Sequence, residues 1–340
     1  MMTLLLIIAG FAGLLLGGEI LVRGAVSIAR RFGMSELVIG LTLVGFGTSL
    51  PELVTSLRAL QADAVGLSIG NVLGSNIANI MLVLGVAAII TPIITSPRAL
   101  ARDGLFMVAA TGLFAVLLWI DAFTRTTGLF MVGLLLTYLV LSIWLDRRRE
   151  NPVALLHQET GEVFEKRDGL WTAIALTIGG ATSIIFGAQF LVQGGTSAAR
   201  MLGVSETVIG ISVLAVGTSL PELVTSFAAA RRGKSDVALG NVLGSNIFNI
   251  LGIIGVSASV IPFSVNASPE LTLGGHAASQ ALTESVVSST DMQALGLSVV
   301  LLALFAYTGR RIARWEGLVL LGGYALYLGL RFGLVPVPGA

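Results

Sequence analysis

The chain has 340 residues, of which 55% are hydrophobic and only 11% are charged, and its mean hydropathy is +0.92. Soluble globular domains carry about 25% charged residues, so this composition excludes a water-soluble protein and indicates an integral membrane protein. A net charge of +1 gives no support to nucleic-acid binding, and the absence of cysteine excludes disulfides and thiolate metal sites.

Ten apolar segments are each long enough to cross the hydrocarbon core as a helix, which takes about 20 residues. In chain order they cover 2–24, 36–60, 66–91, 104–120, 128–145, 170–193, 205–230, 237–261, 292–308 and 316–334. The first lacks a basic leader and a cleavage site, so it is predicted to be a membrane span and not a signal peptide. The fold class predicted is therefore an all-α integral membrane protein with ten transmembrane helices.

The basic residues predict the orientation of these spans. Sixteen of the 20 Lys and Arg residues fall on one side of the predicted membrane and four on the other. Because basic residues concentrate in cytoplasmic loops, this bias predicts a multi-pass protein of the cell membrane with both termini outside and the 146–169 loop in the cytoplasm.

An internal duplication divides the chain into two halves. GTSLPELVTS at 47–56 recurs unchanged at 217–226, and GNVLGSNI at 70–77 recurs at 240–247. Each half holds five predicted spans, and an odd number forces the second half into the membrane upside down. The predicted units are a first repeat at 1–145, a cytoplasmic linker at 146–169 and an inverted repeat at 170–340, with an insertion near 270–288. Inverted repeats are typical of secondary transporters, which bind substrate where the halves meet.

Two carboxylates stand well inside apolar spans, Glu52 and Glu222, at equivalent positions of the repeats. Charged residues are costly at that depth, by about 2.5 to 3.5 kcal/mol on insertion scales, and so indicate a functional site. Pro51 and Pro221 precede them and should free backbone carbonyls one turn back. Glu19 lies four residues before Arg23, so we expect it to form a local ion pair instead.

Further polar side chains recur at helical spacing around the two glutamates. Asn71, Ser75 and Asn79 are four residues apart, as are Asn241, Ser245 and Asn249 in the second repeat. The remaining members of the predicted pocket are hydroxyl residues one turn before each glutamate: Thr48, Ser49, Thr218 and Ser219. A pocket rich in oxygen and free of Cys, His and Met suits hard cations such as Ca²⁺ and Na⁺. The two negative charges of the carboxylates neutralise one divalent ion or offset two monovalent ions.

At GTSLPE and GSNI in both repeats, the sequence resembles the sodium/calcium exchanger family of the cation/calcium antiporter superfamily, especially its prokaryotic ten-span members. The resemblance implies antiport of Na⁺ against Ca²⁺ by alternating access, with Ca²⁺ exported and the first and sixth spans sliding to switch access. It implies an ion site formed by Thr48, Ser49, Glu52, Ser75, Asn79, Thr218, Ser219, Glu222, Ser245 and Asn249. It also implies carbonyl ligands at Gly45 and Ala215.

Several functional alternatives can be compared with this interpretation. A Ca²⁺/H⁺ antiporter is the nearest, because a membrane carboxylate can exchange a proton as readily as Na⁺. An intramembrane hydrolase is disfavoured because both His residues lie in predicted loops and all seven Asp residues lie at span edges. A passive channel would explain the ligands but not the duplication. We expect no enzymatic activity, no cofactor beyond the transported Ca²⁺ and Na⁺, no nucleic-acid partner and no obligate protein partner apart from the lipid bilayer.

Overall fold

The computed structural model describes residues 2–95, 100–147, 169–201, 217–266, 289–308 and 310–331. Within these ranges every regular element is a helix apart from two strands of two residues each. Ala215, most of the 146–169 linker and the 270–288 insertion lie outside the described residues, so predictions about them stay predictions.

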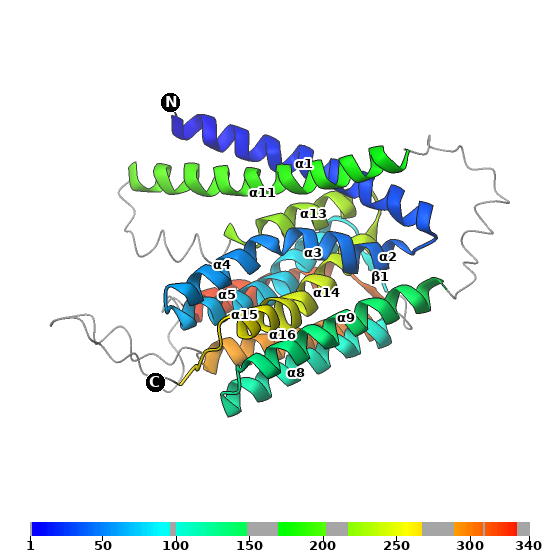
Figure 1. Ribbon diagram of the computed structural model, residues 1–340. Helices are drawn as coiled ribbons and strands as arrows, with labels where there is room; N and C mark the ends of the chain where they lie inside the picture. The colour runs from blue at the N-terminus through cyan, green and yellow to red at the C-terminus, as the bar shows by residue number, and fades with distance from the viewer. Residues whose placement is uncertain are drawn as a thin grey trace.

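Two long helices lie side by side along one face of the bundle, α1 (Met2–Phe32) and α11 (Leu170–Met201) (Figure 1). Glycines allow their backbones to touch, since a Cβ atom on Gly180 would lie only 2.4 Å from the nitrogen of Leu21. Membrane helices approach this closely only where their residues are small. Both helices run about eight residues beyond the predicted spans, because a helix can continue into the interface after its apolar run has ended.

The second predicted span is broken rather than continuous. It consists of α2 (Glu36–Ile39), a π-helical turn η1 (Gly40–Val44), α3 (Gly45–Thr48) and α4 (Leu50–Gln61). The two parts meet at Ser49 with a bend of 42°. Pro51 lies in the first turn of the new helix, where its missing amide costs nothing.

The equivalent break occurs in the second repeat. Ser219 has a backbone conformation of φ −88° and ψ 3°, close to the −91° and 6° of Ser49, and α13 (Leu220–Arg231) begins directly after it. The expectation that Pro51 interrupts one continuing helix is therefore wrong, because α3 ends at Thr48 and α4 starts at Leu50. In the second repeat α13 likewise starts at the leucine that precedes the proline, and residues 202–216 lie outside the described ranges.

Two helices pass through the centre of the bundle next to these breaks. The first comprises α5 (Val65–Ala78), the π-helical turn η2 (Asn79–Val83) and α6 (Leu84–Ile90); the second comprises α14 (Ser235–Ile247), η4 (Phe248–Ile254) and α15 (Gly255–Val260). The most apolar window of the second is completely buried. A Cβ atom on Gly244 would lie 2.3 Å from the carbonyl oxygen of Leu41, so this helix contacts the broken span backbone to backbone.

Five further helices of the described ranges complete the bundle, and those labelled α8, α9 and α16 lie on the side opposite α1 and α11 (Figure 1). The five are η3 (Leu100–Gly104), α8 (Leu105–Ile120), α9 (Arg125–Arg147), α16 (Ser289–Thr308) and α17 (Arg314–Arg331). Their connections join the two halves. Strand β1 (Ile93–Ile94) pairs antiparallel with β2 (Arg311–Ile312), and Phe123 forms an isolated antiparallel bridge with Phe263.

Seven helices in the described ranges are long and apolar enough to cross a membrane, or eight if the bent pair is counted as one span. The multi-pass, all-α membrane fold is therefore confirmed. Helices α13 and α17 occupy the two other predicted segments. The number ten stays a prediction, in part because residues 202–216 of the seventh span lie outside the described ranges.

Candidate cation-binding site

Glu52 and Glu222 lie in the first turns of α4 and α13, and each is only 1% exposed. The breaks at the preceding serines place both carboxylates at helix N-termini, where the helix dipole favours negative charge. The Ser49 hydroxyl, three residues before Glu52, donates a 2.8 Å hydrogen bond to Oε1 of Glu222. The structure thus brings the predicted carboxylates of both repeats into one site.

An asparagine supports the backbone at each glutamate. Nδ2 of Asn71 donates to the carbonyl oxygen of Glu52 at 3.2 Å and to Oγ of Ser56 at 3.0 Å. The second repeat reproduces this arrangement, in which Asn241 donates to the Glu222 carbonyl at 3.3 Å and to Ser226 at 2.9 Å. Each amide therefore ties a glutamate-bearing helix to the adjacent central helix, and the duplication extends to individual hydrogen bonds.

The predicted hydroxyl groups join elements from the two repeats. The Thr48 hydroxyl donates to Oδ1 of Asn241 at 3.3 Å, and the hydroxyls of Ser75 and Thr218 lie 3.5 Å apart. Ser245 donates to the carbonyl oxygen of Gly45 at 3.3 Å. That carbonyl also accepts from the Ser49 amide, so it is not left without a donor as the sequence predicted. The reason is that the helix breaks after this hydrogen bond and not before it.

The two predicted asparagine ligands begin or occupy π-helical turns. Asn79 is the first residue of η2, and Asn249 lies in η4. Nδ2 of Asn249 donates to Oδ1 of Asn76 at 3.0 Å, which orients its own Oδ1 away from that contact. Such π turns occur frequently at functional sites because they shift the register of the side chains that follow.

Many polar atoms of this site are buried without a hydrogen-bond partner among the described residues. Six of them are oxygens of predicted site residues: both carboxylate oxygens of Glu52, Oε2 of Glu222, Oγ of Ser219, and Oδ1 of Asn79 and of Asn249. Buried polar atoms are ordinarily satisfied, so this concentration of unsatisfied oxygens requires an explanation. A bound cation would supply it.

Other buried carboxylates in the described part of the chain differ in this respect. Asp103 accepts two hydrogen bonds from Arg102, at 2.7 and 2.8 Å, and one from the Tyr138 hydroxyl at 3.1 Å. Asp291 accepts from the Tyr327 hydroxyl at 2.9 Å. Glu52 and Glu222 are thus distinguished by their incomplete pairing as well as by their depth.

Sequence reasoning passed over three pairs of supporting residues. They are Ser56 with Ser226 and Asn76 with Asn246, together with the glutamate-holding role of Asn71 with Asn241. All six lie inside the two sequence segments that recur unchanged in both repeats, and this recurrence could have identified them. Each is at most 4% exposed and hydrogen-bonds within the site region. The sequence also contained no sign of the long-range partner of Glu19, whose carboxylate pairs with Arg232, the residue that follows α13, at 2.9 Å.

The groups at this site that could bind a cation are carboxylates, hydroxyls, side-chain amides and backbone carbonyls, all of which bind through oxygen. In the described ranges no group of three or more His, Cys, Asp or Glu side chains converges. A divalent ion held here would therefore depend on two carboxylates supplemented by hydroxyl, amide and carbonyl oxygens, the ligand chemistry of Ca²⁺ rather than of transition metals.

Comparison with known proteins places this geometry in a family. The family described as "Sodium/calcium exchanger protein" matches residues 2–144 and 172–333. The chain is 35% identical to "Sodium/calcium exchanger MaX1" of Methanosarcina acetivorans, over 96% of this chain and 98% of that protein. It is 31% identical to "Inner membrane protein YrbG" of Escherichia coli, over 98% and 97%. A solved structure of the sodium-calcium exchanger NCX_Mj, soaked with Na⁺ and Sr²⁺, superposes with a TM-score of 0.79 at 31% identity, covering 97% of this chain and 98% of that one.

Proposed function

Because the chain belongs to the sodium/calcium exchanger family, a family of cation/Ca²⁺ antiporters and not of enzymes, we propose that it exchanges Na⁺ for Ca²⁺ by alternating access and exports Ca²⁺. The observation that carries the proposal is the set of six buried oxygens without partners around Glu52 and Glu222. Ca²⁺ takes six to eight oxygen ligands, so this set alone approaches the number that one ion requires.

The ion ligands in this proposal are the side chains predicted from the sequence. They are Thr48, Ser49, Glu52, Ser75, Asn79, Thr218, Ser219, Glu222, Ser245 and Asn249, with carbonyl oxygens at Gly45 and Ala215. The cross-repeat hydrogen bonds of Ser49, Thr48 and Ser245 support a shared site between the halves. In an ion-loaded state we expect several of these hydrogen bonds to be replaced by ion contacts.

The proposed architecture is ten spans in two inverted five-helix repeats, with both termini outside. Two matching features support the repeat. Asn71 and Asn241 donate equivalent hydrogen bonds to the carbonyls of Glu52 and Glu222, and the backbone has nearly the same conformation at Ser49 and Ser219. The β1–β2 pair and the Phe123–Phe263 bridge also support it, since each joins a connection of one repeat to a connection of the other. The bias of sixteen basic residues against four supports the orientation.

Charge balance explains why such a pocket favours exchange over leakage. The formal charge of Glu52 and Glu222 is neutralised by one Ca²⁺ and offset by two or more Na⁺. An empty pocket would leave two like charges buried and uncompensated, which is strongly unfavourable in a low-dielectric interior. Switching between the two sides should therefore be favoured when ions are bound, which couples the flow of one cation to the counterflow of the other.

A proton could replace Na⁺ in this cycle, because protonation also neutralises a buried carboxylate. The decisive experiment is ⁴⁵Ca²⁺ uptake into proteoliposomes that contain the purified protein. We expect uptake with an outward Na⁺ gradient at equal pH and none with a pH gradient in Na⁺-free buffer. Uptake driven only by the pH gradient would refute Na⁺ coupling, and equal uptake without any counter-ion gradient would indicate a channel.

A further inference from the structure

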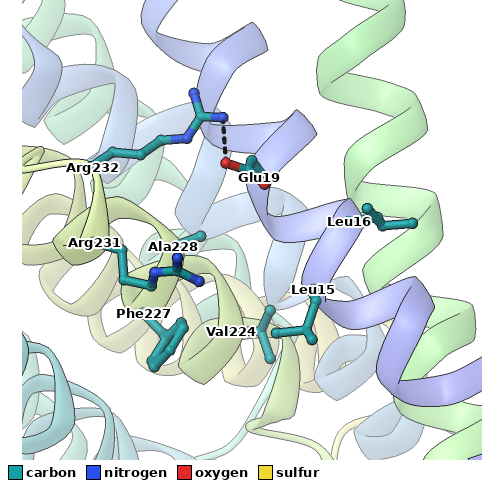
Figure 2. A pocket seen from close by; sticks show the side chains of 8 residues that line it. All are labelled: Leu15, Leu16, Glu19, Val224, Phe227, Ala228, Arg231 and Arg232. Atoms are coloured by element: carbon teal, nitrogen blue, oxygen red, sulfur yellow. Dashed lines mark hydrogen bonds and ion pairs between the residues drawn. The ribbon is translucent and has the colours of Figure 1, made fainter. Parts of the chain in front are cut away.

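A groove of about 170 Å³ opens between α1 and α13, and none of the residues that line it belongs to the candidate cation site (Figure 2). Apolar side chains line most of its length, among them Leu15 of α1 and Val224 and Phe227 of α13. Leu15 is 53% exposed. An apolar groove of this kind, open at the surface of a membrane protein, faces lipid chains.

One end of the groove is cationic. Arg231 extends from the end of α13 toward α1 and lies over the Phe227 ring, 5.9 Å from its centroid (Figure 2). Among the described residues it has no carboxylate partner. The neighbouring Arg232 is held by Glu19 of α1 at 2.9 Å. The three charged groups have a formal net charge of +1, which complements one phosphodiester.

The duplication shows that the fold does not require this charge. At the equivalent positions of the first repeat, Gln61 and Ala62 replace the two arginines, and Gln189 of α11 replaces Glu19. The residues of the cation site, by contrast, are retained in both repeats. The positive-inside bias accounts for arginines on this side of the membrane, but not for their convergence with a carboxylate at the mouth of an apolar groove.

We propose that this groove binds one anionic phospholipid, with the phosphate between Arg231 and Arg232 and an acyl chain along Leu15, Val224 and Phe227. Arginine pairs with phosphate through charge-assisted, frequently bidentate hydrogen bonds. Basic pockets between helices on the cytoplasmic side are a recognised form of lipid-headgroup site. The apolar length of the groove favours a lipid over free phosphate. The proposal is independent of which ions the protein exchanges.

Native mass spectrometry of the purified protein in detergent micelles, titrated with defined lipids, tests the site. We expect the wild type to retain one phosphatidylglycerol per chain in clear preference to phosphatidylcholine or phosphatidylethanolamine. The R231Q/R232Q variant should bind phosphatidylglycerol on the order of tenfold more weakly, as expected for the loss of about 1.4 kcal/mol or more of charge-assisted bonding. The matched control is R310Q/R311Q, which removes two adjacent exposed arginines that do not line the groove.

Three outcomes of the lipid titrations would overturn the proposal, and a fourth, from a competition experiment, would do so as well. The first three are unchanged lipid retention in R231Q/R232Q, equal weakening in R310Q/R311Q, and retention of zwitterionic lipids as strong as that of phosphatidylglycerol. Displacement of the bound lipid by inorganic phosphate or soluble glycerophosphoglycerol would instead reveal a simple anion site, which also refutes it. If R231Q/R232Q does not fold, the single variant R231Q decides, because Arg231 has no ion pair to lose among the described residues; it should weaken phosphatidylglycerol binding at least threefold.

Discussion

The contact between α1 and α11 can be tested with two adjacent glycines of α11. A Cβ atom at position 180 would lie 2.4 Å from the nitrogen of Leu21 and 2.8 Å from the carbonyl oxygen of Gly17, whereas a Cβ atom at position 179 would have no neighbour within 4 Å. Ordinary contacts of a Cβ atom begin near 3.4 Å. The substitution Gly180→Ala must therefore push the two backbones apart by about 1 Å at this crossing.

The expected cost follows from the energetics of overpacking. Inserting one methylene into a well-packed interface typically costs about 1 to 3 kcal/mol. At roughly 2 °C per kcal/mol for a chain of this size, Gly180→Ala should lower the melting temperature by about 2 to 6 °C. Gly179→Ala should leave it unchanged or raise it slightly, because alanine is a better helix former by about 0.5 to 1 kcal/mol.

Thermal unfolding of the detergent-solubilised protein, followed by the fluorescence of its four tryptophans, measures this difference. The reasoning is refuted if Gly180→Ala is as stable as the wild type. It is equally refuted if Gly179→Ala is destabilised as much as Gly180→Ala, since the effect would then not arise from the helix contact.

Three further predictions concern residues outside this contact. Asn241→Leu removes the hydrogen bonds to the Glu222 carbonyl and to Ser226. Because it leaves these buried partners unsatisfied, it should lower the free energy of unfolding by about 2 to 4 kcal/mol. An unchanged melting temperature would show that these two hydrogen bonds are dispensable. Asp103→Leu should cost about 3 to 5 kcal/mol because it removes the buried partner of Arg102, whose own side chain is only 19% exposed, and normal expression and melting would contradict this. For Asp121, burial opposes ionisation, but hydrogen bonds from Ser264 and from the amides of residues 265 and 266 outweigh it and hold the pKa of this carboxyl below its usual value. Its stabilising contribution should therefore be present above the unfolded-state pKa and lost as the pH falls through the folded-state pKa, so Asp121→Asn should melt earlier than wild type at pH 7 and the difference should shrink on acidification; a difference independent of pH would argue against this assignment.

The residues of the candidate cation site could be identified in the sequence largely because membrane burial makes polar residues conspicuous. Glu52 and Glu222 stand out in apolar spans, and the repeated letters identify their neighbours. The structure joins the two repeats at several of these residues, with Ser49 bonded to Glu222 and Ser245 bonded to the carbonyl of Gly45. The family assignment drawn from the same motifs is confirmed by the matches over nearly the whole chain.

Local backbone geometry was harder to predict. A proline within an apolar run is compatible with either a kinked helix or a fresh helix start, and only the structure shows the break at Ser49. The partner of Glu19 was missed for a related reason. Arg23 is a neighbour on the same helix, whereas Arg232 reaches Glu19 from the residue after α13. A contact across 213 residues of sequence leaves no periodic signal.

Direct Ca²⁺ binding to carboxylate variants tests the central claim, that the unsatisfied oxygens around Glu52 and Glu222 hold the transported cation. Equilibrium ⁴⁵Ca²⁺ binding to the purified protein in Na⁺-free buffer should detect a site in the wild type that added Na⁺ displaces. Glu52→Gln and Glu222→Gln should each weaken Ca²⁺ binding at least about tenfold, since each removes a charged ligand worth about 1.5 to 3 kcal/mol. The matched control Glu36→Gln, which breaks only the partly exposed ion pair with Lys234, should bind as the wild type does. Wild-type Ca²⁺ affinity in both Glu52→Gln and Glu222→Gln would contradict the account.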